Sequence, residues 1–334
     1  MLKSPLDVLA IGNAIVDVIA HTDEAFLVAQ GVQKGAMQLI DEARAETLYG
    51  AMGPATVISG GSAANTAVGA ASLGARVGFV GKVRDDELGG LFTHDLRATG
   101  VAFETAAARE GPATARCFVL VTPDGERTMN TYLGACQNLT AADVDPETVR
   151  AARIVYLEGY LWDPPAAKDA FRKAAQVAHE AGNAVALTLS DSFCVDRYRD
   201  EFLGLVRERS VDVLFANIHE LKSLYQTADE DSAVAALRNE GILGVVTRSE
   251  AGALVVTREA TRAVPAAPIG RLVDSTGAGD LFAAGFLAGL ARDLDHADCA
   301  RLGALAAAEV IQHIGARPQA DLRDLARQEG LLAA

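Results

Sequence analysis

Short apolar runs alternate with longer amphipathic segments along most of the chain. Five of these runs are nearly continuous in hydrophobic residues, which is typical of strands covered on both faces. They lie at 6–12, 152–159, 184–190, 211–217 and 243–248. Helical patterns fall between them, and the one at 165–181 stops at Gly182, as helices commonly do. The alternation predicts βα units stacked on a largely parallel sheet.

The segment 115–133 departs from this rhythm. Its β-rich runs flank Pro123, Asp124 and Gly125, which are turn residues typical of an antiparallel hairpin. Apolar residues also alternate near the start of 15–40, so that segment could supply further strands to the same element. We therefore expect a small β-sheet that projects from the main one.

Composition narrows the classes of partner. The 334 residues are 50% hydrophobic and 22% charged, a balance typical of globular proteins. With 44 acidic and 30 basic residues the net charge is -14, which would repel nucleic acid and anionic lipid, so neither is an expected partner. The longest relevant apolar stretch, 281–291, is too short to cross a bilayer. We expect a soluble cytoplasmic protein with small-molecule ligands.

The four cysteines give no sign of a disulfide framework or a metal site. They stand far apart, with no CxxC pair: Cys117, Cys136, Cys194 and Cys299. This spacing favours reduced thiols in the core of a cytosolic protein.

The segment 273–290 begins with a glycine-rich turn and continues into a helix that is apolar on every side and is therefore buried. The buried N-terminus of such a helix leaves backbone N–H donors that favour an anion. The amides of Gly277, Ala278, Gly279 and Asp280 could cradle phosphate oxygens, and the Asp280 carboxylate could accept a proton from an attacking hydroxyl. Alternatively, Asp280 only complements the helix dipole and the glycines only form a turn.

A second small-residue segment lies at 59–74. Gly60 and Gly61 would let the backbone approach a ligand closely, and Asn65 offers a donor and an acceptor to sugar-like hydroxyls. A tight turn followed by an Ala-rich packing helix is an equally good interpretation of the same residues.

The motif pair GGSAANTA at 60–67 and DSTGAGD at 274–280 resembles the two signature motifs of the ribokinase (PfkB-type) family of small-molecule kinases. The similarity runs from Asp7 to the HIGARP segment at 313–318, and the N-terminal stretch is most similar to adenosine kinases. The resemblance implies an α/β three-layer sandwich with a mostly parallel central sheet and a small β-sheet lid. It assigns 1–14, 41–104 and 134–334 to the large domain, and 15–40 and 105–133 to the lid.

The resemblance also implies roles for individual residues. Asp280 matches the catalytic base, and the amides of Gly277, Ala278, Gly279 and Asp280 match the anion hole. The acceptor side is implied at Asn13, Asp17, Gly60, Gly61 and Asn65. Without the family, Asp17 would be interpreted as a polar residue near the end of a strand.

On the nucleotide side, NIHE at 217–220 resembles a motif in which Asn217 and Glu220 organise Mg²⁺ through water. A helix cap made by the same two residues is at least as good an interpretation. TRSEAG at 247–252 resembles the loop where Thr247 and Gly252 flank ATP, with Ser249 at a position where glycine is common. His313 and Gly315 lie where the family lines its adenine pocket.

The resemblance singles out two further pairs of residues. Arg116 and Arg127 lie on the expected hairpin and could reach the transferred phosphate, although solvated arginines are commoner there. Asp274 and Ser275 are the positions where a monovalent cation such as K⁺ would bind behind the anion hole, and the resemblance leaves open whether this chain needs one.

Other nucleotide motifs are absent. The sequence has no GxxxxGK[ST] phosphate loop, no HRD or DFG set and no GxGxxG after the first strand. The resemblance implies an ATP- and Mg²⁺-dependent kinase acting on a primary hydroxyl of a ribosyl compound, with adenosine to AMP first. Ribose, fructose, inosine and guanosine are the alternative acceptors, and a non-catalytic nucleotide sensor is the other class considered. A monomer and a dimer are both compatible with the sequence.

Overall fold

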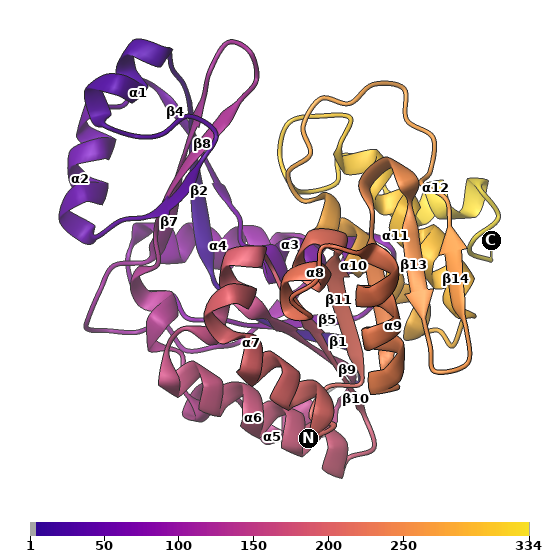
Figure 1. The fold of residues 1–334 in the computed structure, drawn as a ribbon. Coiled ribbons are helices and arrows are strands. Elements are labelled where there is room, and N and C mark those ends of the chain that lie inside the picture. Colours follow the sequence, from indigo (N-terminus) through magenta and orange to yellow (C-terminus); the bar gives the residue numbers. More distant parts are fainter. Residues whose placement is uncertain (1–4, 334) are drawn as a thin grey trace.

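The large domain is built on a nine-stranded sheet in the order β14-β13-β12-β11-β10-β9-β1-β5-β6 (Figure 1). The computed structural model describes residues 5–333, so residues 1–4 and 334 of the expected large domain lie outside it. The strands run parallel as far as β12, and the last two are antiparallel. Their bounds are β1 (Leu6–Ile11), β5 (Val77–Val80), β6 (Ala102–Phe103), β9 (Ala152–Glu158), β10 (Ala184–Thr188), β11 (Val213–Asn217), β12 (Leu243–Thr247), β13 (Ala253–Val256) and β14 (Thr261–Val264). All five predicted strands are confirmed.

Helices cover both faces of this sheet and bury two separate apolar cores. One face carries α3 (Ser62–Ser72), α4 (Glu87–Ala98), α10 (Ala278–Leu290), α11 (His296–Val310) and α12 (Leu322–Gln328). The other carries α5 (Pro146–Arg150), α6 (Pro165–Glu180), α7 (Ser192–Arg207), α8 (Ile218–Leu224) and α9 (Glu230–Glu240). The architecture is therefore the predicted three-layer α/β sandwich.

A smaller five-stranded sheet projects from the large domain at the upper left of Figure 1. Its order is β3 (Met37–Leu39), β8 (Arg127–Tyr132), β7 (Ala115–Val121), β2 (Ile15–His21) and β4 (Ala55–Ser59). β7 and β8 form the predicted antiparallel hairpin, and Gly125 in its turn has a φ of +84°. α1 (Glu24–Gln30) and α2 (Glu42–Ala51) pack on this sheet through a small apolar cluster that includes Leu27 and Leu48.

The smaller sheet extends further along the chain than the sequence suggested. β4 lies within 41–104, which was expected in the large domain, yet it pairs antiparallel with β2, with Val16 opposite Ser59. The reason is that α2 packs on the smaller sheet and returns the chain to its edge before α3 begins. A division by sheet membership would therefore place residues up to 59 with the lid.

α10 is a largely buried helix whose first turn lies at the candidate site. Its residues from Leu281 to Gly289 are all buried, as the apolar pattern predicted. Gly285 lets it approach α11 closely, since a Cβ at that position would lie 2.4 Å from the carbonyl oxygen of Leu302. The position of α10 is therefore set by backbone contact rather than by adjustable side chains.

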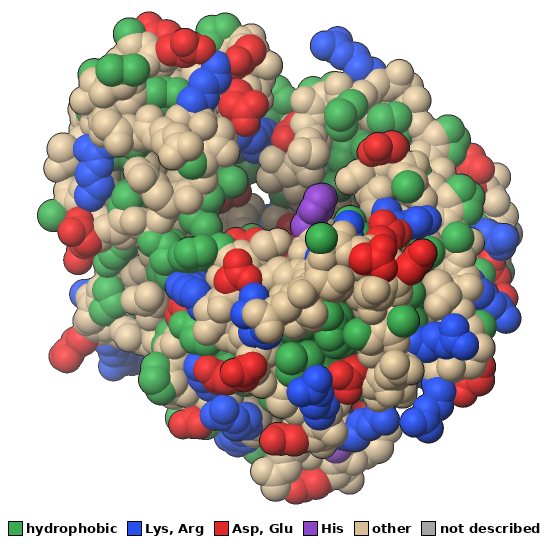
Figure 2. All heavy atoms as spheres, viewed as in Figure 1, with side chains coloured by type: hydrophobic (Ala, Val, Ile, Leu, Met, Phe, Trp, Pro, Cys, Tyr) green, Lys and Arg blue, Asp and Glu red, His purple; other side chains and the backbone are tan. Residues whose placement is uncertain are grey.

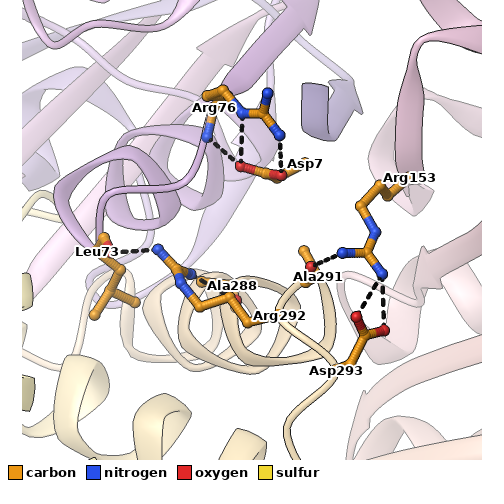
Figure 3. Close-up of polar contacts among 8 residues, drawn as sticks. All are labelled: Asp7, Leu73, Arg76, Arg153, Ala288, Ala291, Arg292 and Asp293. Carbon is orange, nitrogen blue, oxygen red and sulfur yellow. Dashed lines mark hydrogen bonds and ion pairs between the residues drawn. The ribbon is translucent and has the colours of Figure 1, made fainter. Parts of the chain in front are cut away.

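Two arginines fix the far end of α10 (Figure 3). Arg292 donates to the carbonyl oxygens of Ala288 (2.6 Å) and Leu73 (2.8 Å), which joins the C-termini of α10 and α3. Arg153, on β9, donates to the carbonyl oxygen of Ala291 and forms an ion pair with Asp293. Two carbonyl oxygens at the C-terminus of α10, those of Ala288 and Ala291, thus accept hydrogen bonds from cations, which the helix dipole favours.

Two expectations from composition can be compared with the structure. The four cysteines are all free and buried, as predicted. Among the described residues, no helix combines the length and the apolar character needed to cross a bilayer.

The close packing of α10 on α11 generates a stability prediction. Gly285→Ala forces a methyl group against the backbone of α11, so we expect a loss of about 1–3 kcal/mol and a Tm lower by about 2–6 °C. Gly204→Ala, in α7, is the matched control, because a Cβ added at that position would have nothing within 4 Å. Its Tm should be unchanged or higher. Thermal unfolding of both variants tests this, and a Gly285→Ala protein as stable as the unmodified chain would contradict it.

Candidate functional site

Polar residues gather at the carboxyl ends of the parallel strands. Glu158, Asn217 and Thr247 are the last residues of β9, β11 and β12, while Asn13 and Asp191 follow β1 and β10 closely. Open α/β sheets bind ligands at this edge. The smaller sheet stands beside it, and Figure 2 shows a hollow between the lobe with α1 and α2 and the rest of the molecule. The structure thus places three of the expected site residues, Asn13, Asn217 and Thr247, along one edge.

Asp280 lies in the first turn of α10 and faces α3. Its Oδ1 accepts a hydrogen bond from Ser62 Oγ (2.6 Å), and its Oδ2 accepts one from Asn65 Nδ2 (3.1 Å). Thr66 Oγ1 donates to its backbone oxygen (3.1 Å). Burial raises the pKa of the Asp280 carboxyl above its usual value, although these two side-chain hydrogen bonds oppose the shift. The two motif segments, more than 200 residues apart in sequence, therefore meet at this carboxylate.

The loop before α10 has the geometry of an anion cradle. Gly277 is the N-cap with a φ of +80°, and no side chain caps this helix. A Cβ on Gly277 would lie 2.7 Å from the Cα of Ala316, so only glycine fits. The backbone N–H of Ala278 donates to the carbonyl oxygen of Ser275 (3.2 Å). The amides of Gly279 and Asp280, in the first turn, belong to the set of N–H groups that an α-helix leaves without an intrahelical acceptor. An anion bound there would be stabilised by those donors and by the helix dipole.

Glu158 organises the acceptor side. It is 1% exposed, and its oxygens accept from Asn13 Nδ2 (2.7 Å) and from the backbone N–H of Ala63 (2.8 Å). Burial raises its pKa to about 7. The adjacent Gly61 has a φ of +93°, and a Cβ there would lie 2.4 Å from the backbone oxygen of Asn13. This carboxyl thus ties the ends of β1 and β9 to the start of α3.

Asp17, on β2, packs directly on the glycine pair. A Cβ on Gly60 would lie 2.3 Å from Asp17 Oδ2, so the residue at 60 must be glycine for this carboxylate to sit where it does. Burial raises the pKa of Asp17 to about 6, and the positive charges of Arg317 and Arg127 oppose that shift. Asp17 therefore sits beside Gly60 and within the electrostatic reach of Asp280, which raises its pKa further.

A cavity of about 380 Å³ opens between these residues and the smaller sheet. One end is polar and includes Asn13, Asp17, Gly61, Ser62 and Glu158. The walls beyond it are mainly apolar: Ile15, Met37, Leu39, Cys117, Met129, Leu133 and Phe193. Tyr160, Asp163, Asp191 and Arg197 complete the lining, with Thr131. The volume is typical of a small-molecule site.

Asn217 and Glu220 form a helix capping box at the start of α8. Asn217 Oδ1 accepts from the backbone N–H of Glu220 (2.9 Å), and Glu220 Oε2 accepts from the backbone N–H of Asn217 (2.9 Å). Burial raises the pKa of Glu220 to about 7. The capping interpretation is confirmed.

The side-chain oxygens of this capping box already accept hydrogen bonds, which suits a metal ion bound through water rather than directly. Each Glu220 oxygen keeps a further lone pair, so the donor set suits a hydrated Mg²⁺ held through water. Among the described residues, no cluster of three or more His, Cys, Asp or Glu side chains could hold a metal directly. Any magnesium would therefore take most of its ligands from water and phosphate.

The loop after β12 turns sharply. Gly252 has a φ of +80°, and a Cβ there would lie 2.1 Å from the backbone oxygen of Val264. Ser249, where glycine is common in the family, adopts a φ of +53°, which explains that preference. Thr247 ends the strand before this loop.

The two residues expected near the adenine pocket make different kinds of contact, one local and one long-range. The His313 ring Nε2 lies 3.2 Å from Glu309 Oε1, so this side chain pairs with its own helix region. The backbone N–H of Gly315 donates to Asp274 Oδ2 (2.9 Å), which joins this segment to the loop before α10.

The two hairpin arginines point in different directions. Arg127 forms an ion pair with Asp274 (2.5 Å), so the hairpin touches the loop before α10. Arg116 instead pairs with Glu46 on α2 and lies near the Phe118 ring. Asp274 also accepts from Thr276 Oγ1 (2.7 Å), so the residue considered for a cation is already engaged by Arg127, Thr276 and Gly315.

Sequence reasoning missed several residues that touch this site, among them Ser62, Glu158 and Arg317. Ser62 and Asn65 are three residues apart on one helix, so helical spacing could have placed both on one face. Glu158 is a carboxylate at the end of an otherwise apolar strand, which is a usable signal. Arg317 lies in a loop, and no periodicity points to it.

The comparisons with known proteins agree with this geometry. Residues 7–322 match the family model described as "pfkB family carbohydrate kinase". The chain is 50% identical to a probable sugar kinase from Rhizobium etli CFN 42 of known structure, over 99% of this chain and 100% of that one, with a TM-score of 0.94. It is 53% identical to the adenosine kinase from Sinorhizobium meliloti, over 98% and 100% of the two chains, with a TM-score of 0.92.

A more distant relative carries a different activity in its name. The ATP-dependent ribose-1-phosphate kinase of Halopiger xanaduensis is 35% identical over 229 residues, which is 69% of this chain and 72% of that protein. The family match spans nearly the whole chain, and these relatives are kinases that phosphorylate an alcohol group of a small molecule. The chain therefore belongs to the pfkB family of carbohydrate kinases.

Proposed function

We propose that the protein is an ATP-dependent kinase that transfers the γ-phosphoryl group to the primary hydroxyl of a nucleoside, with adenosine as the first candidate. The observation that carries this proposal is the shape and chemistry of the cavity. Its polar end suits a ribose, because Asn13 and Asp17 offer hydrogen-bonding groups beside the Gly60–Gly61 turn. Its longer apolar walls suit the face of a base. A free sugar would leave those walls without a partner.

The charge of the cavity also favours a neutral acceptor. Four carboxylates line it, Asp17, Glu158, Asp163 and Asp191. The one arginine of the lining, Arg197, already pairs with Asp163 (3.1 Å). A phosphate group brought among these carboxylates would be repelled, which argues against a sugar phosphate such as ribose 1-phosphate. The 53% identity to an adenosine kinase supports the same choice.

Phosphoryl transfer follows from the placement of Asp280. Its carboxylate accepts the proton of the primary hydroxyl as that oxygen attacks the γ-phosphorus, while the bond from this phosphorus to the bridging oxygen breaks and ADP leaves. The backbone amides at the N-terminus of α10 stabilise the charge on the phosphoryl oxygens. Ser62 and Asn65 hold the carboxylate in place. When bound, Mg²⁺ would neutralise charge on the nucleotide phosphates, and Asn217 and Glu220 would hold its water ligands.

The choice of acceptor is tested by ADP release at fixed Mg·ATP against adenosine, inosine, guanosine, ribose, fructose and ribose 1-phosphate. Burying roughly 100 Å² of a base face is worth about 2.5 kcal/mol, so we expect kcat/KM for adenosine to exceed that for the free sugars by about 50-fold or more. Phe193→Ala should reduce the kcat/KM for adenosine more than that for ribose. A preference for fructose or ribose 1-phosphate would contradict the nucleoside assignment.

The role of Asp280 is tested by Asp280→Asn. We expect turnover to fall by about 10²–10⁴-fold with nearly unchanged affinity for ATP, because the amide cannot accept the proton. Asp298→Asn is the matched control, since Asp298 also lies in the first turn of a helix, α11, but pairs only with Arg301 there. Normal turnover in the Asp280 variant would exclude it as the base. Equal losses in both variants would show a helix-dipole effect instead.

The raised pKa of Asp17 predicts a pH dependence. Below about pH 6 this half-buried carboxyl is neutral and no longer accepts two hydrogen bonds from the sugar, so kcat/KM for the acceptor should fall about tenfold per pH unit on the acid side and level off above pH 6. Asp17→Asn should lower kcat/KM and remove this fall below pH 6, which is the acid limb of the pH profile. Glu158→Gln is the comparison, because Glu158 titrates near pH 7 in the same cavity. A limb that persists in Asp17→Asn and vanishes in Glu158→Gln would refute the assignment.

A further inference from the structure

Arg317 reaches from the segment after α11 into the acceptor side of the site. Its Nη1 donates to Ser59 Oγ (2.5 Å), at the end of β4, and its Nε donates to Asn65 Oδ1 (3.4 Å) on α3. Its Nη2 is buried and donates to no atom of residues 5–333. The HIGARP segment at 313–318 contains this residue, but neither that resemblance nor the family match assigns a role to it.

The contact with Asn65 determines how the Asn65 amide is oriented. A side-chain amide has its oxygen and its nitrogen on opposite branches, so fixing one fixes the other. Because Arg317 can only donate, Asn65 must turn its oxygen toward Arg317 and its nitrogen toward Asp280 Oδ2, 3.1 Å away. With the amide reversed, its oxygen would face the carboxylate oxygen and repel it.

Arg317 also brings a positive charge toward Asp17, because it binds Ser59, and the next residue, Gly60, lies directly against the Asp17 carboxylate. The charged and titratable groups that face Asp17 are Arg317, Arg127 from β8, Asp280 from α10 and the Cys117 thiol from β7. Arg317 itself faces Asp17 and Asp95, and Asp95 accepts from Ser59 Oγ (3.1 Å). Of the two cations, only Arg317 also contacts the residue that holds Asp280.

The same segment touches the loop before α10. The backbone N–H of Gly315 donates to Asp274, and Ala316 packs against Gly277. Three consecutive residues, 315–317, therefore contact the anion cradle and the acceptor side at once.

We propose that Arg317 is a positioning residue for phosphoryl transfer: it fixes the Asn65 amide in the orientation that donates to Asp280, and it places a positive charge beside Asp17. This inference rests on the proposed role of Asp280. It predicts two separable effects, one on turnover through Asn65 and one on the pH profile through Asp17.

The test compares Arg317→Met, Arg317→Lys, Asn65→Ala and the Arg317→Met/Asn65→Ala double variant, with the best acceptor of the panel. Arg317→Met should lower kcat by about 10- to 100-fold, because misplaced catalytic groups cost this much. Its acid limb should move up by about 1 pH unit, because Asp17 loses a facing cation. In the Asn65→Ala background the same substitution should change kcat by less than about twofold, since the two residues act as a unit.

Arg317→Lys keeps the charge but loses the planar fork, so its kcat should fall while its acid limb stays near that of the unmodified chain. If Arg317→Met does not fold, the kcat of Arg317→Lys tests the positioning role instead. Arg292→Met is the matched control, because Arg292 is a partly buried arginine bound to carbonyl oxygens at the opposite end of α10. We expect it to lower Tm without moving the acid limb.

Multiplicative effects of Arg317→Met and Asn65→Ala, or an unmoved acid limb in Arg317→Met, would overturn the proposal, as would a kcat for Arg317→Lys equal to that of the unmodified chain. These results are distinguishable from a failure of the proposed function, which would appear as normal turnover in Asp280→Asn whatever the Arg317 variants do.

Discussion

The site depends on one half-buried carboxylate, Asp280, held at the start of α10 by two donors from α3. This contact requires α3 and α10 to lie side by side with little between them. Gly69 makes that possible, since a Cβ there would lie 2.5 Å from Leu281 Cδ1 and 2.8 Å from the Cβ of Ala284. At the opposite end Arg292 joins the two helices again. The apolar character of α10 therefore has a functional consequence, because a helix packed on all sides holds its N-terminus in a fixed position.

Burial gives the acceptor side its chemistry. Asp17 and Glu158 are desolvated, so their pKa values rise to about 6 and about 7, and each is kept in place by glycines or backbone amides that allow close approach. A cavity built in this way accepts hydroxyl donors well and repels anions. The protein as a whole is acidic, but the proposed preference for a neutral acceptor rests on the local arrangement of these carboxylates rather than on the net charge of -14.

Much of the fold could be predicted because each run of hydrophobic residues corresponds to one strand of the sheet. The five strands, the buried helix and the lid hairpin all follow from residues that are close in sequence. β4 was misplaced because its partner, β2, lies much earlier in the chain, and only tertiary packing through α2 brings them together. The direction of a side chain could not be predicted either. Arg116 and Arg127 look equivalent in the hairpin sequence, yet Arg116 pairs with α2 and Arg127 pairs with the large domain. Arg317 depends on loop geometry, which no pattern of residues encodes.

The most direct test of the account is the crystal structure of the protein with adenosine and a non-hydrolysable ATP analogue bound. The account predicts that the primary hydroxyl oxygen lies within hydrogen-bond distance of the Asp280 carboxylate, about 2.6–3.2 Å, with the terminal phosphate at the amides that begin α10. An acceptor bound elsewhere, or a hydroxyl separated from Asp280 by another side chain, would contradict it.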